Sequence, residues 1–346
     1  MRHRAFRRSA RTESFQLKMR IGSGLSVLLP IAILLGLGTA HSLPQIGSNL
    51  GAVIDPLVLT LLFLVFFEMR FSPLRKASDH LGFLSLAWVS NFIVIPALAW
   101  VLAVLFFGSQ PALYAGLLLY LLFPCTDWFL AFTRIAGGDV ALGSVLIPIN
   151  LISQLLLFPI YLALFIGSDT SLDLIGIGKT FGQWFLIPLL LAMSVRFLLS
   201  KLLGPDRFEP IPRLVGSLVP WTLSVLVFCI FSFHSPQLVI HSQTFPLILL
   251  AVFLFFVLTW LLVDFFARSF RLSRPKRVLL AMTTTARNSP LMLGLATIAL
   301  PGQPLVYAVL IIGMLVEFPH LTVLSRLFQR EGRRFSPTEG HPVTST

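Results

Sequence analysis

The chain has 346 residues, of which 56% are apolar and 12% are charged, and its mean hydropathy is +0.89. This composition excludes an ordinary soluble domain and indicates an integral membrane protein. The net charge of +12 would suggest nucleic-acid binding in a soluble protein, but basic residues of a membrane protein mark its cytoplasmic loops. We therefore predict the lipid bilayer as a partner and no nucleic acid.

The basic N-terminal segment, residues 1–20, precedes an apolar stretch and in this respect imitates a secretory signal. The pair Arg7-Arg8 also loosely resembles a twin-arginine leader. However, the apolar stretch is as long as a membrane span, and nine more such stretches follow it. We interpret it as the first transmembrane helix and residues 1–20 as a cytoplasmic tail.

Ten apolar stretches have about the 20 residues that a helix needs to cross a bilayer, and short breaks with turn residues separate them. The stretches cover residues 21–40, 50–69, 81–107, 112–135, 140–167, 180–200, 213–233, 245–267, 278–300 and 304–325. The fold class that we predict is an all-α polytopic membrane protein with ten transmembrane helices.

The distribution of Lys and Arg tests this assignment, because a wrongly placed span would mix the two sides of the membrane. Of the 26 basic residues, 24 fall on the side that carries both termini. Lys179 alone lies on the other side, and Arg287 lies inside the ninth stretch. We predict a multi-pass protein of the plasma (inner) membrane with both termini in the cytoplasm.

The polar segment 168–179 divides the ten stretches into two sets of five. Two halves with an odd number of helices insert in opposite orientations, which is the arrangement of an inverted repeat. The predicted organisation is a first five-helix repeat, an external linker, a second repeat and a cytoplasmic C-terminal tail. These parts cover residues 21–167, 168–179, 180–325 and 326–346.

The fourth and ninth stretches each contain a polar break with a proline. The breaks read "PCTDW" at 124–128, with Pro124, and "TTTARNSP" at 283–290, with Pro290. Unwound backbone in a membrane is tolerated where it lines a cavity or lies within protein, and matching breaks in two halves indicate a transport site. The alternative is a pair of proline kinks that only adjust helix packing.

Three ionisable residues lie deep in predicted spans: Asp127, Arg287 and Glu317. Charges in hydrocarbon are costly, so each suggests a function. An ion pair of Asp127 with Arg287 would cancel both charges and could be purely structural. The functional alternative makes Asp127 a proton carrier and Arg287 an internal cation. Asp139, which follows two glycines, is predicted to cap the fifth helix.

Cys125 follows the helix-breaking Pro124 and could face Arg287, and a cationic neighbour favours the thiolate form. A thiolate is a soft ligand for a thiophilic solute, whereas a buried thiol can also serve as a small apolar group. The second cysteine, Cys229, has no polar neighbours in sequence and fits the apolar interpretation. Asn150 and Gln154 lie one helical turn apart and could face the same cavity or bond between helices.

From Asn91 onward the chain resembles the arsenite-efflux permeases of the bile acid/sodium symporter superfamily. The likeness is carried by "NFIVIPALAW" (91–100), by "PCTDWFLAFTRIAGGD" (124–139), by "NLISQ" (150–154) and by "LVEFP" (315–319). This resemblance implies two inverted five-helix repeats whose broken fourth and ninth helices cross at mid-membrane. It also implies export of trivalent arsenic, As(III), as cargo at Cys125, in exchange for protons and with help from Glu317.

Two departures from the family pattern leave an alternative open. Arg287 stands where the family has an asparagine, Pro290 stands where it has a glutamate, and Asp127 is an unusual neighbour for the cysteine. The extra cation favours an anionic substrate, as in bile acid:sodium symporter-like transport of an organic anion. Because Arg287 would repel sodium, we favour H+ over Na+ as the coupling ion.

We predict a secondary transporter of a small molecule or oxyanion, and not an enzyme, because no Ser/His/Asp or Cys/His set lies at one membrane depth. A membrane receptor or scaffold with the same fold is the alternative from another class. No cofactor and no resident metal are predicted. The predicted substrate-binding residues are Cys125, Thr126, Asn150, Arg287, Asn288 and Glu317, and the predicted proton-coupling residues are Asp127 and Glu317.

Overall fold

The computed structural model describes residues 27–68, 80–126, 128–165, 186–240 and 242–334, and these residues form helices joined by short turns. Seven helices within these ranges are long and apolar enough to cross a bilayer, so the chain is a multi-pass integral membrane protein. They are Gly51–Glu68, Leu81–Phe107, Val140–Phe165, Ile187–Gly204, Leu214–Ser235, Phe245–Ser269 and Pro304–Gly332. Shorter apolar helices are Val27–Ser42, Pro111–Leu122 and Ser289–Ala299.

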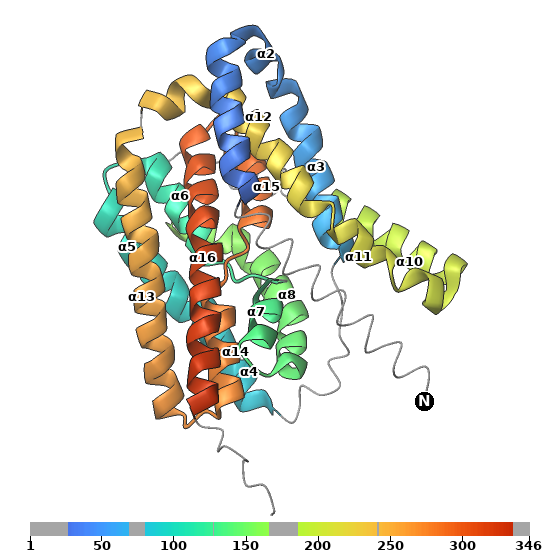
Figure 1. Cartoon of the computed structure of the whole chain (residues 1–346), viewed down its shortest axis with the longest axis vertical. Coiled ribbons are helices and arrows are strands. Elements are labelled where there is room, and N and C mark those ends of the chain that lie inside the picture. The colour runs from blue at the N-terminus through green and yellow to red at the C-terminus, as the bar shows by residue number, and fades with distance from the viewer. Residues whose placement is uncertain (1–26, 69–79, 127, 166–185, 241, 335–346) are drawn as a thin grey trace, which may run out of the picture.

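Figure 1 labels most of the helices. Their bounds are α2 (Pro44–Asn49), α3 (Gly51–Glu68), α4 (Leu81–Val89), a π-helical turn (Ser90–Val94), α5 (Ile95–Phe107), α6 (Pro111–Leu122), α7 (Trp128–Ile135), α8 (Val140–Phe165), α10 (Ile187–Phe208), α11 (Ile211–Gly216), α12 (Val219–Ile240), α13 (Phe245–Ser269), α14 (Arg274–Thr285), α15 (Ser289–Ala299) and α16 (Pro304–Arg334).

The helices form two groups. In the first, α16 packs against α6, α13 and α15, with α5, α7 and α14 beside them. In the second, α3 packs against α10, α11 and α12, and α10 extends away from the rest of the molecule (Figure 1). The groups meet where α3 contacts α15 and where α12 contacts α16. The predicted breaks lie in the first group.

The first break separates α6 from α7. Phe123 is extended, with φ −115° and ψ 130°, which is the conformation that a residue before a proline prefers. Pro124 itself follows in the unwound segment, and α7 begins at Trp128. The stretch predicted as one span over 112–135 is therefore two short helices around Pro124.

The second break separates α14 from α15. Ala286 is extended, with φ −72° and ψ 131°, and Asn288 is the N-cap residue of α15. Pro290 lies in the first turn of α15, where a proline is tolerated because the N–H that it lacks would have no partner within the helix. The two predicted helix-breaking prolines therefore lie at different places: Pro124 in the unwound segment and Pro290 just after it.

A single π-helical turn, Ser90–Val94, interrupts the helix over 81–107. Pro96 follows it and has no N–H to donate to the carbonyl of Phe92. The hydroxyl of Tyr161, from α8, donates to this carbonyl instead. Asn91 lies within the π turn and is fully buried, so the irregular backbone carries a polar side chain into the first group of helices.

Several predicted boundaries differ from the structure. The break expected between the stretches 180–200 and 213–233 is mostly helical, because Gly204, at φ 71°, changes the direction of the chain within one residue and helical turns follow it. The last helix continues to Arg334, so the tail expected from 326 begins as helix. The predicted N-terminal tail, residues 1–20, and the external linker, residues 168–179, lie outside the described residues.

The prediction that Asp139 caps the fifth helix is confirmed. α8 begins at the next residue, Val140, and the Asp139 Oδ1 accepts the backbone N–H of Leu142 at 2.9 Å. The backbone N–H of Asp139 in turn donates to the carbonyl of Pro275 at 3.1 Å, which ties the start of α8 to the start of α14. This contact helps to position both broken segments relative to α8.

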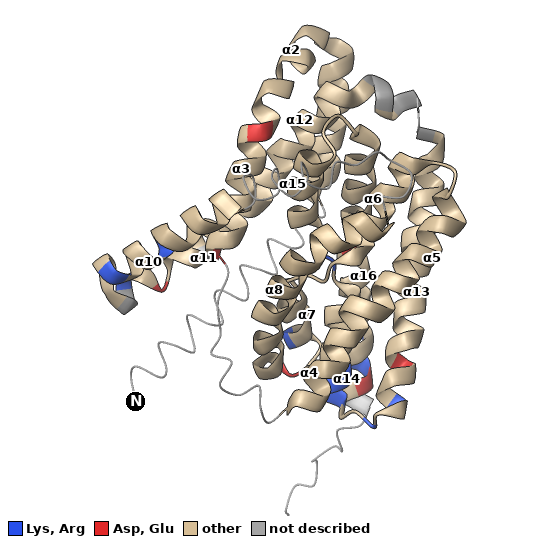
Figure 2. Ribbon diagram, turned by 180° about the vertical axis from the view of Figure 1, so that it is seen from behind, with Lys and Arg blue, Asp and Glu red and all other residues tan. Residues whose placement is uncertain are grey.

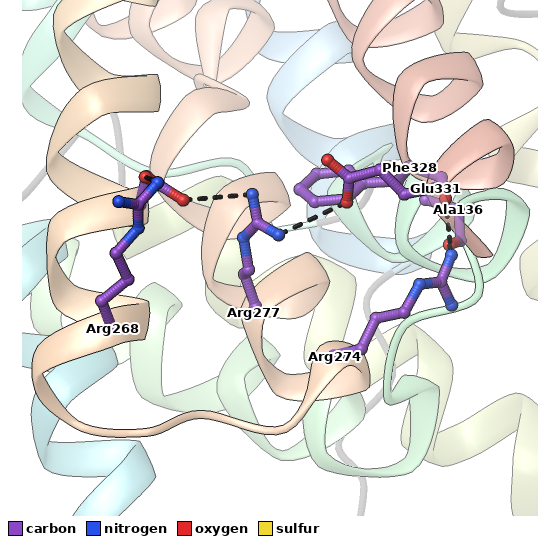
Figure 3. A network of polar contacts seen from close by, with 7 residues as sticks. Ala136, Arg268, Arg274, Arg277, Phe328 and Glu331 are labelled. Atoms are coloured by element: carbon purple, nitrogen blue, oxygen red, sulfur yellow. Dashed lines mark hydrogen bonds and ion pairs between the residues drawn. The ribbon is translucent and has the colours of Figure 1, made fainter. Parts of the chain in front are cut away.

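Charged residues gather where α13 and α16 end and α14 begins, and at the far end of α10 (Figure 2). At the first of these places, Arg277 of α14 lies 3.2 Å from Asp264 of α13 and 3.3 Å from Glu331 of α16 (Figure 3). The nearby Arg274 donates to the carbonyl of Phe328 at 2.6 Å. These contacts join three helices of the first group at one end.

Candidate functional site

The two breaks pair with each other through their backbones. Pro124 and Arg287 face one another in an isolated antiparallel bridge. The N–H of Cys125 donates to the carbonyl of Ala286 at 2.9 Å, and the N–H of Asn288 donates to the carbonyl of Phe123 at 3.1 Å. Unwound backbone in hydrocarbon must find partners within the protein, and here each break supplies them to the other. We call this place the crossing.

The guanidinium of Arg287 is buried at the crossing, with 1% of the residue exposed. Among the described residues it donates to backbone carbonyls of two helices that end there. The Nη1 atom lies 3.0 Å from the Leu121 carbonyl of α6, and the other acceptors are the carbonyls of Thr283, Thr284 and Thr285 in α14. Arg287 therefore satisfies main-chain groups that a helix end leaves without partners.

Glu317, from α16, binds the backbone of Arg287. Its Oε1 accepts the backbone N–H of Arg287 at 2.8 Å, and its Oε2 accepts the Ser289 hydroxyl at 3.1 Å. The hydroxyl of Tyr120 lies 3.4 Å from Oε2 and donates to the Gly313 carbonyl at 2.9 Å. A carboxylate at the start of α15 complements the positive end of that helix.

Cys125 lies at the N-terminal end of α7 and is 2% exposed. Its Sγ accepts the backbone N–H of Trp128, the first residue of α7, at 3.2 Å. The guanidinium of Arg287 is near enough for an electrostatic interaction with this cysteine. Cysteines that act as nucleophiles or as metal ligands are commonly found at helix N-termini or beside cations.

Amide and hydroxyl side chains form a second polar group beside the crossing. The Asn288 amide donates to the Gln154 Oε1 at 3.2 Å and to the Thr126 hydroxyl at 3.4 Å. On the α14 side, the Thr283 hydroxyl accepts the Asn91 amide at 3.0 Å and the Asn150 amide at 3.2 Å. We call these six residues the amide cluster: Asn91, Thr126, Asn150, Gln154, Thr283 and Asn288.

Three polar atoms of the amide cluster are buried and have no hydrogen-bond partner among the described residues. They are the Oδ1 atoms of Asn91 and Asn150, and the Nε2 atom of Gln154. A buried polar atom without a partner costs about 1–3 kcal/mol. Two acceptors and one donor of the amide cluster are thus left unsatisfied by the described residues.

The structure brings most of the predicted site residues together. Arg287 and Glu317 meet through a backbone N–H, and Thr126 meets Asn288. Asn150 reaches the same region through Thr283. Asp127 lies outside the described residues, so its predicted pairing with Arg287 stays a prediction. What the described structure adds is that Arg287 has main-chain carbonyls as partners.

Sequence reasoning missed Asn91, Thr283, Tyr120 and Ser289 as members of this region. Pro96, five residues after Asn91, was a usable signal, since a proline in an apolar helix leaves a carbonyl free and often accompanies an irregular turn. Tyr120 in an apolar span also pointed to a buried partner for its hydroxyl. Among the residues that the structure describes, no group of three or more His, Cys, Asp or Glu side chains is placed to hold a metal ion.

Two interrupted helices that pair within an apolar helical bundle, with buried polar and charged side chains around them, define a membrane transporter. Comparison with known proteins agrees. Residues 55–242 match the Sodium Bile acid symporter family, and the chain belongs to this family.

The chain is also similar to the arsenical-resistance protein Acr3 of Corynebacterium glutamicum. The two are 25% identical over 249 residues, which cover 64% of this chain and 65% of that protein. The similarity thus spans just under two thirds of the relative's length.

Proposed function

We propose that this protein is a secondary transporter that exports arsenite or a related trivalent metalloid, with Cys125 as the ligand for the cargo. The observation that carries the proposal is the position of Cys125 at the crossing. Its Sγ accepts an N–H at the start of α7 and lies near the Arg287 cation. Similarity to an arsenical-resistance protein supports the same cargo.

The chemistry of binding is a ligand exchange at arsenic. In arsenous acid, As(OH)3, the sulfur of Cys125 forms an S–As bond, one As–O bond breaks, and the hydroxide leaves as water with the thiol proton. The reverse exchange releases the cargo on the other side of the membrane. A single sulfur ligand keeps this exchange reversible, whereas three would hold As(III) too firmly for transport.

The amide cluster supports recognition of the remaining hydroxyl groups. The unpaired Oδ1 atoms of Asn91 and Asn150 can accept from them, and the Gln154 amide can donate to them. Thr126 and Asn288 complete the substrate-binding set. Uncharged amides suit arsenous acid, which is uncharged. A site that hydrogen-bonds hydroxyl groups also discriminates strongly against solutes that lack them.

Exchange for protons is the coupling that we propose, with Asp127 and Glu317 as the proton-coupling residues. Glu317 holds the backbone of the crossing through the Arg287 N–H, so a change in its charge would act directly on the bridge. Asp127 is adjacent to the cargo ligands in sequence. Intramembrane carboxylates are common proton carriers in transporters.

We further propose that the chain has ten transmembrane helices in two inverted five-helix repeats and that both termini are cytoplasmic in the plasma (inner) membrane. The pairing of one broken segment from each half supports the repeats, since transporters with inverted halves bind substrate where their interrupted helices meet. The bias of Lys and Arg to one predicted side supports the orientation.

Arsenite accumulation in everted membrane vesicles tests the proposal. We expect wild-type vesicles to take up arsenite faster when a pH gradient is imposed, and we expect Cys125→Ser to abolish this uptake. The matched control is Cys229→Ser, because Cys229 is equally buried but lies in α12. Full uptake by Cys125→Ser would disprove the role of the sulfur.

A wild-type protein that moves no arsenite would instead favour the second candidate function, transport of an organic anion. Membership in the Sodium Bile acid symporter family supports this candidate. The same vesicles would then be tested with a labelled bile acid. Absence of both fluxes would favour the receptor or scaffold.

A further inference from the structure

The crossing contains the C-terminal ends of two helices, α6 and α14. The last carbonyls of a helix have no partner within the helix, and they carry the negative end of its dipole. In transporters with interrupted helices, such ends and the unwound backbone carbonyls coordinate the coupling cation. The place between α6 and α14 therefore has the chemistry of a cation site.

In this chain the cation is a side chain. Arg287 donates to the Leu121 carbonyl at 3.0 Å and to the Thr283 carbonyl at 3.2 Å, and it also contacts the carbonyls of Thr284 and Thr285. One guanidinium thus joins the ends of both helices. Its planar group carries several N–H donors, so one side chain can bind carbonyls of both helices at once.

The surroundings hold the guanidinium in place. The ring of Phe255, from α13, lies with its centroid 5.6 Å from the Arg287 Cζ, within the range of a cation–π contact. The opposite charge is supplied by Glu317, which binds the backbone of the same residue at 2.8 Å. Charge and hydrogen bonding at this place are balanced by groups of the chain itself.

We propose that Arg287 is a tethered cation that takes the place of a coupling cation between the ends of α6 and α14. The protein therefore neither binds sodium at the crossing nor needs it for transport. Sodium is the ion to test, because the family to which the chain belongs is that of sodium bile acid symporters. The inference concerns the coupling ion and does not depend on which cargo is moved.

Thermal unfolding of the purified protein in detergent provides a test that needs no substrate. We expect the unfolding midpoint of the wild type to be the same in sodium chloride and in choline chloride at equal ionic strength. In Arg287→Ser, which frees the carbonyls, we expect a lower midpoint that sodium raises and choline does not. Arg287→Lys keeps the positive charge and should remain insensitive to sodium.

A sodium-specific rise of the wild-type midpoint would overturn the inference, even if Arg287→Ser cannot be purified. An Arg287→Ser protein that folds but gains no response to sodium would also contradict it. As a second measurement, the flux of the wild type in vesicles should not change when choline replaces sodium. Loss of flux without sodium would overturn the inference but leave the proposed cargo intact, whereas the Cys125→Ser experiment tests the cargo alone.

Discussion

Arg287 links Glu317 to the ends of two helices: the guanidinium of Arg287 binds carbonyls at the ends of α6 and α14, while its backbone N–H donates to the Glu317 carboxylate at 2.8 Å. The positive charge thus lies at two helix C-termini, and the negative charge lies at the N-terminus of α15. Both positions are favourable for the respective helix dipole. This relationship makes the two charges mutually dependent.

Removal of Glu317 should therefore destabilise the protein strongly. Glu317→Ala leaves the buried Arg287 cation without its counter-charge, and we expect a loss of about 3–5 kcal/mol in the free energy of unfolding. Glu317→Gln keeps two polar atoms at the same place and should lose less. Unfolding in detergent measures both values.

The control for this prediction is Glu331→Gln. Glu331 pairs with Arg277 at 3.3 Å, and its side chain is 36% exposed, so we expect a change of about 0–1 kcal/mol. An equal loss of stability for Glu331→Gln and Glu317→Ala would show that the burial of the Glu317 carboxylate does not increase its contribution to the free energy of unfolding.

Gly313 allows Tyr120 to reach Glu317. A Cβ atom added at Gly313 would lie 2.5 Å from the Tyr120 ring, so Gly313→Ala must push the ring aside. We expect a loss of about 1–3 kcal/mol in the free energy of unfolding, which is typical of an overpacked core.

The matched control is Gly38→Ala, because a Cβ atom added at Gly38 meets nothing within 4 Å. Alanine also favours a helix over glycine, so this variant should be neutral or slightly more stable. Similar losses at both positions would argue against the steric explanation.

Thr283 holds two members of the amide cluster with one hydroxyl group. Thr283→Val keeps the shape but leaves the amides of Asn91 and Asn150 without their acceptor. Because each unpaired buried group costs about 1–3 kcal/mol, we expect arsenite flux at low concentration to fall tenfold or more. Initial rates in everted vesicles measure this change.

Thr297→Val serves as the comparison, since the Thr297 hydroxyl donates to the Gly294 carbonyl within its own helix at 2.9 Å. We expect this variant to transport normally. If Thr283→Val also transports normally, the amide cluster does not contribute to substrate binding.

Tyr161 supplies the donor that Pro96 cannot give to the Phe92 carbonyl. Tyr161→Phe leaves this buried carbonyl without its donor, and we expect a loss of about 1–3 kcal/mol. The double variant Tyr161→Phe, Pro96→Ala restores a backbone N–H and should recover part of that loss. Additive losses in the double variant would mean that the two residues do not serve the same carbonyl.

The helical architecture and the positions of both breaks could be predicted because their signals are local. Apolar stretches of sufficient length indicate membrane helices, and a proline within one of them, such as Pro124, indicates an interruption. The cap formed by Asp139 was equally local, since it depends on a side chain and a backbone N–H three residues apart.

The partners of Arg287 could not be predicted in the same way. The partner expected from the sequence, Asp127, lies outside the described residues, and backbone carbonyls are not visible in a sequence in the way that charged side chains are. Which carbonyls lie near Arg287 depends on how α6 and α14 cross, and no residue type records that geometry. The helical turns that follow Gly204 could not be predicted for a related reason, since turn residues in the sequence do not show that one residue with positive φ is enough to redirect the chain.

The bridge between Pro124 and Arg287 also constrains how the cargo can be carried. If the two breaks separated, the N–H groups of Cys125 and Asn288 would lose their acceptors within the membrane, where unpaired backbone groups are costly. We therefore expect the paired breaks to travel as one unit and to take Cys125 with them. Access of the cargo site to the two sides of the membrane would then alternate by an elevator mechanism, in which the first helix group slides past α3 and α10–α12.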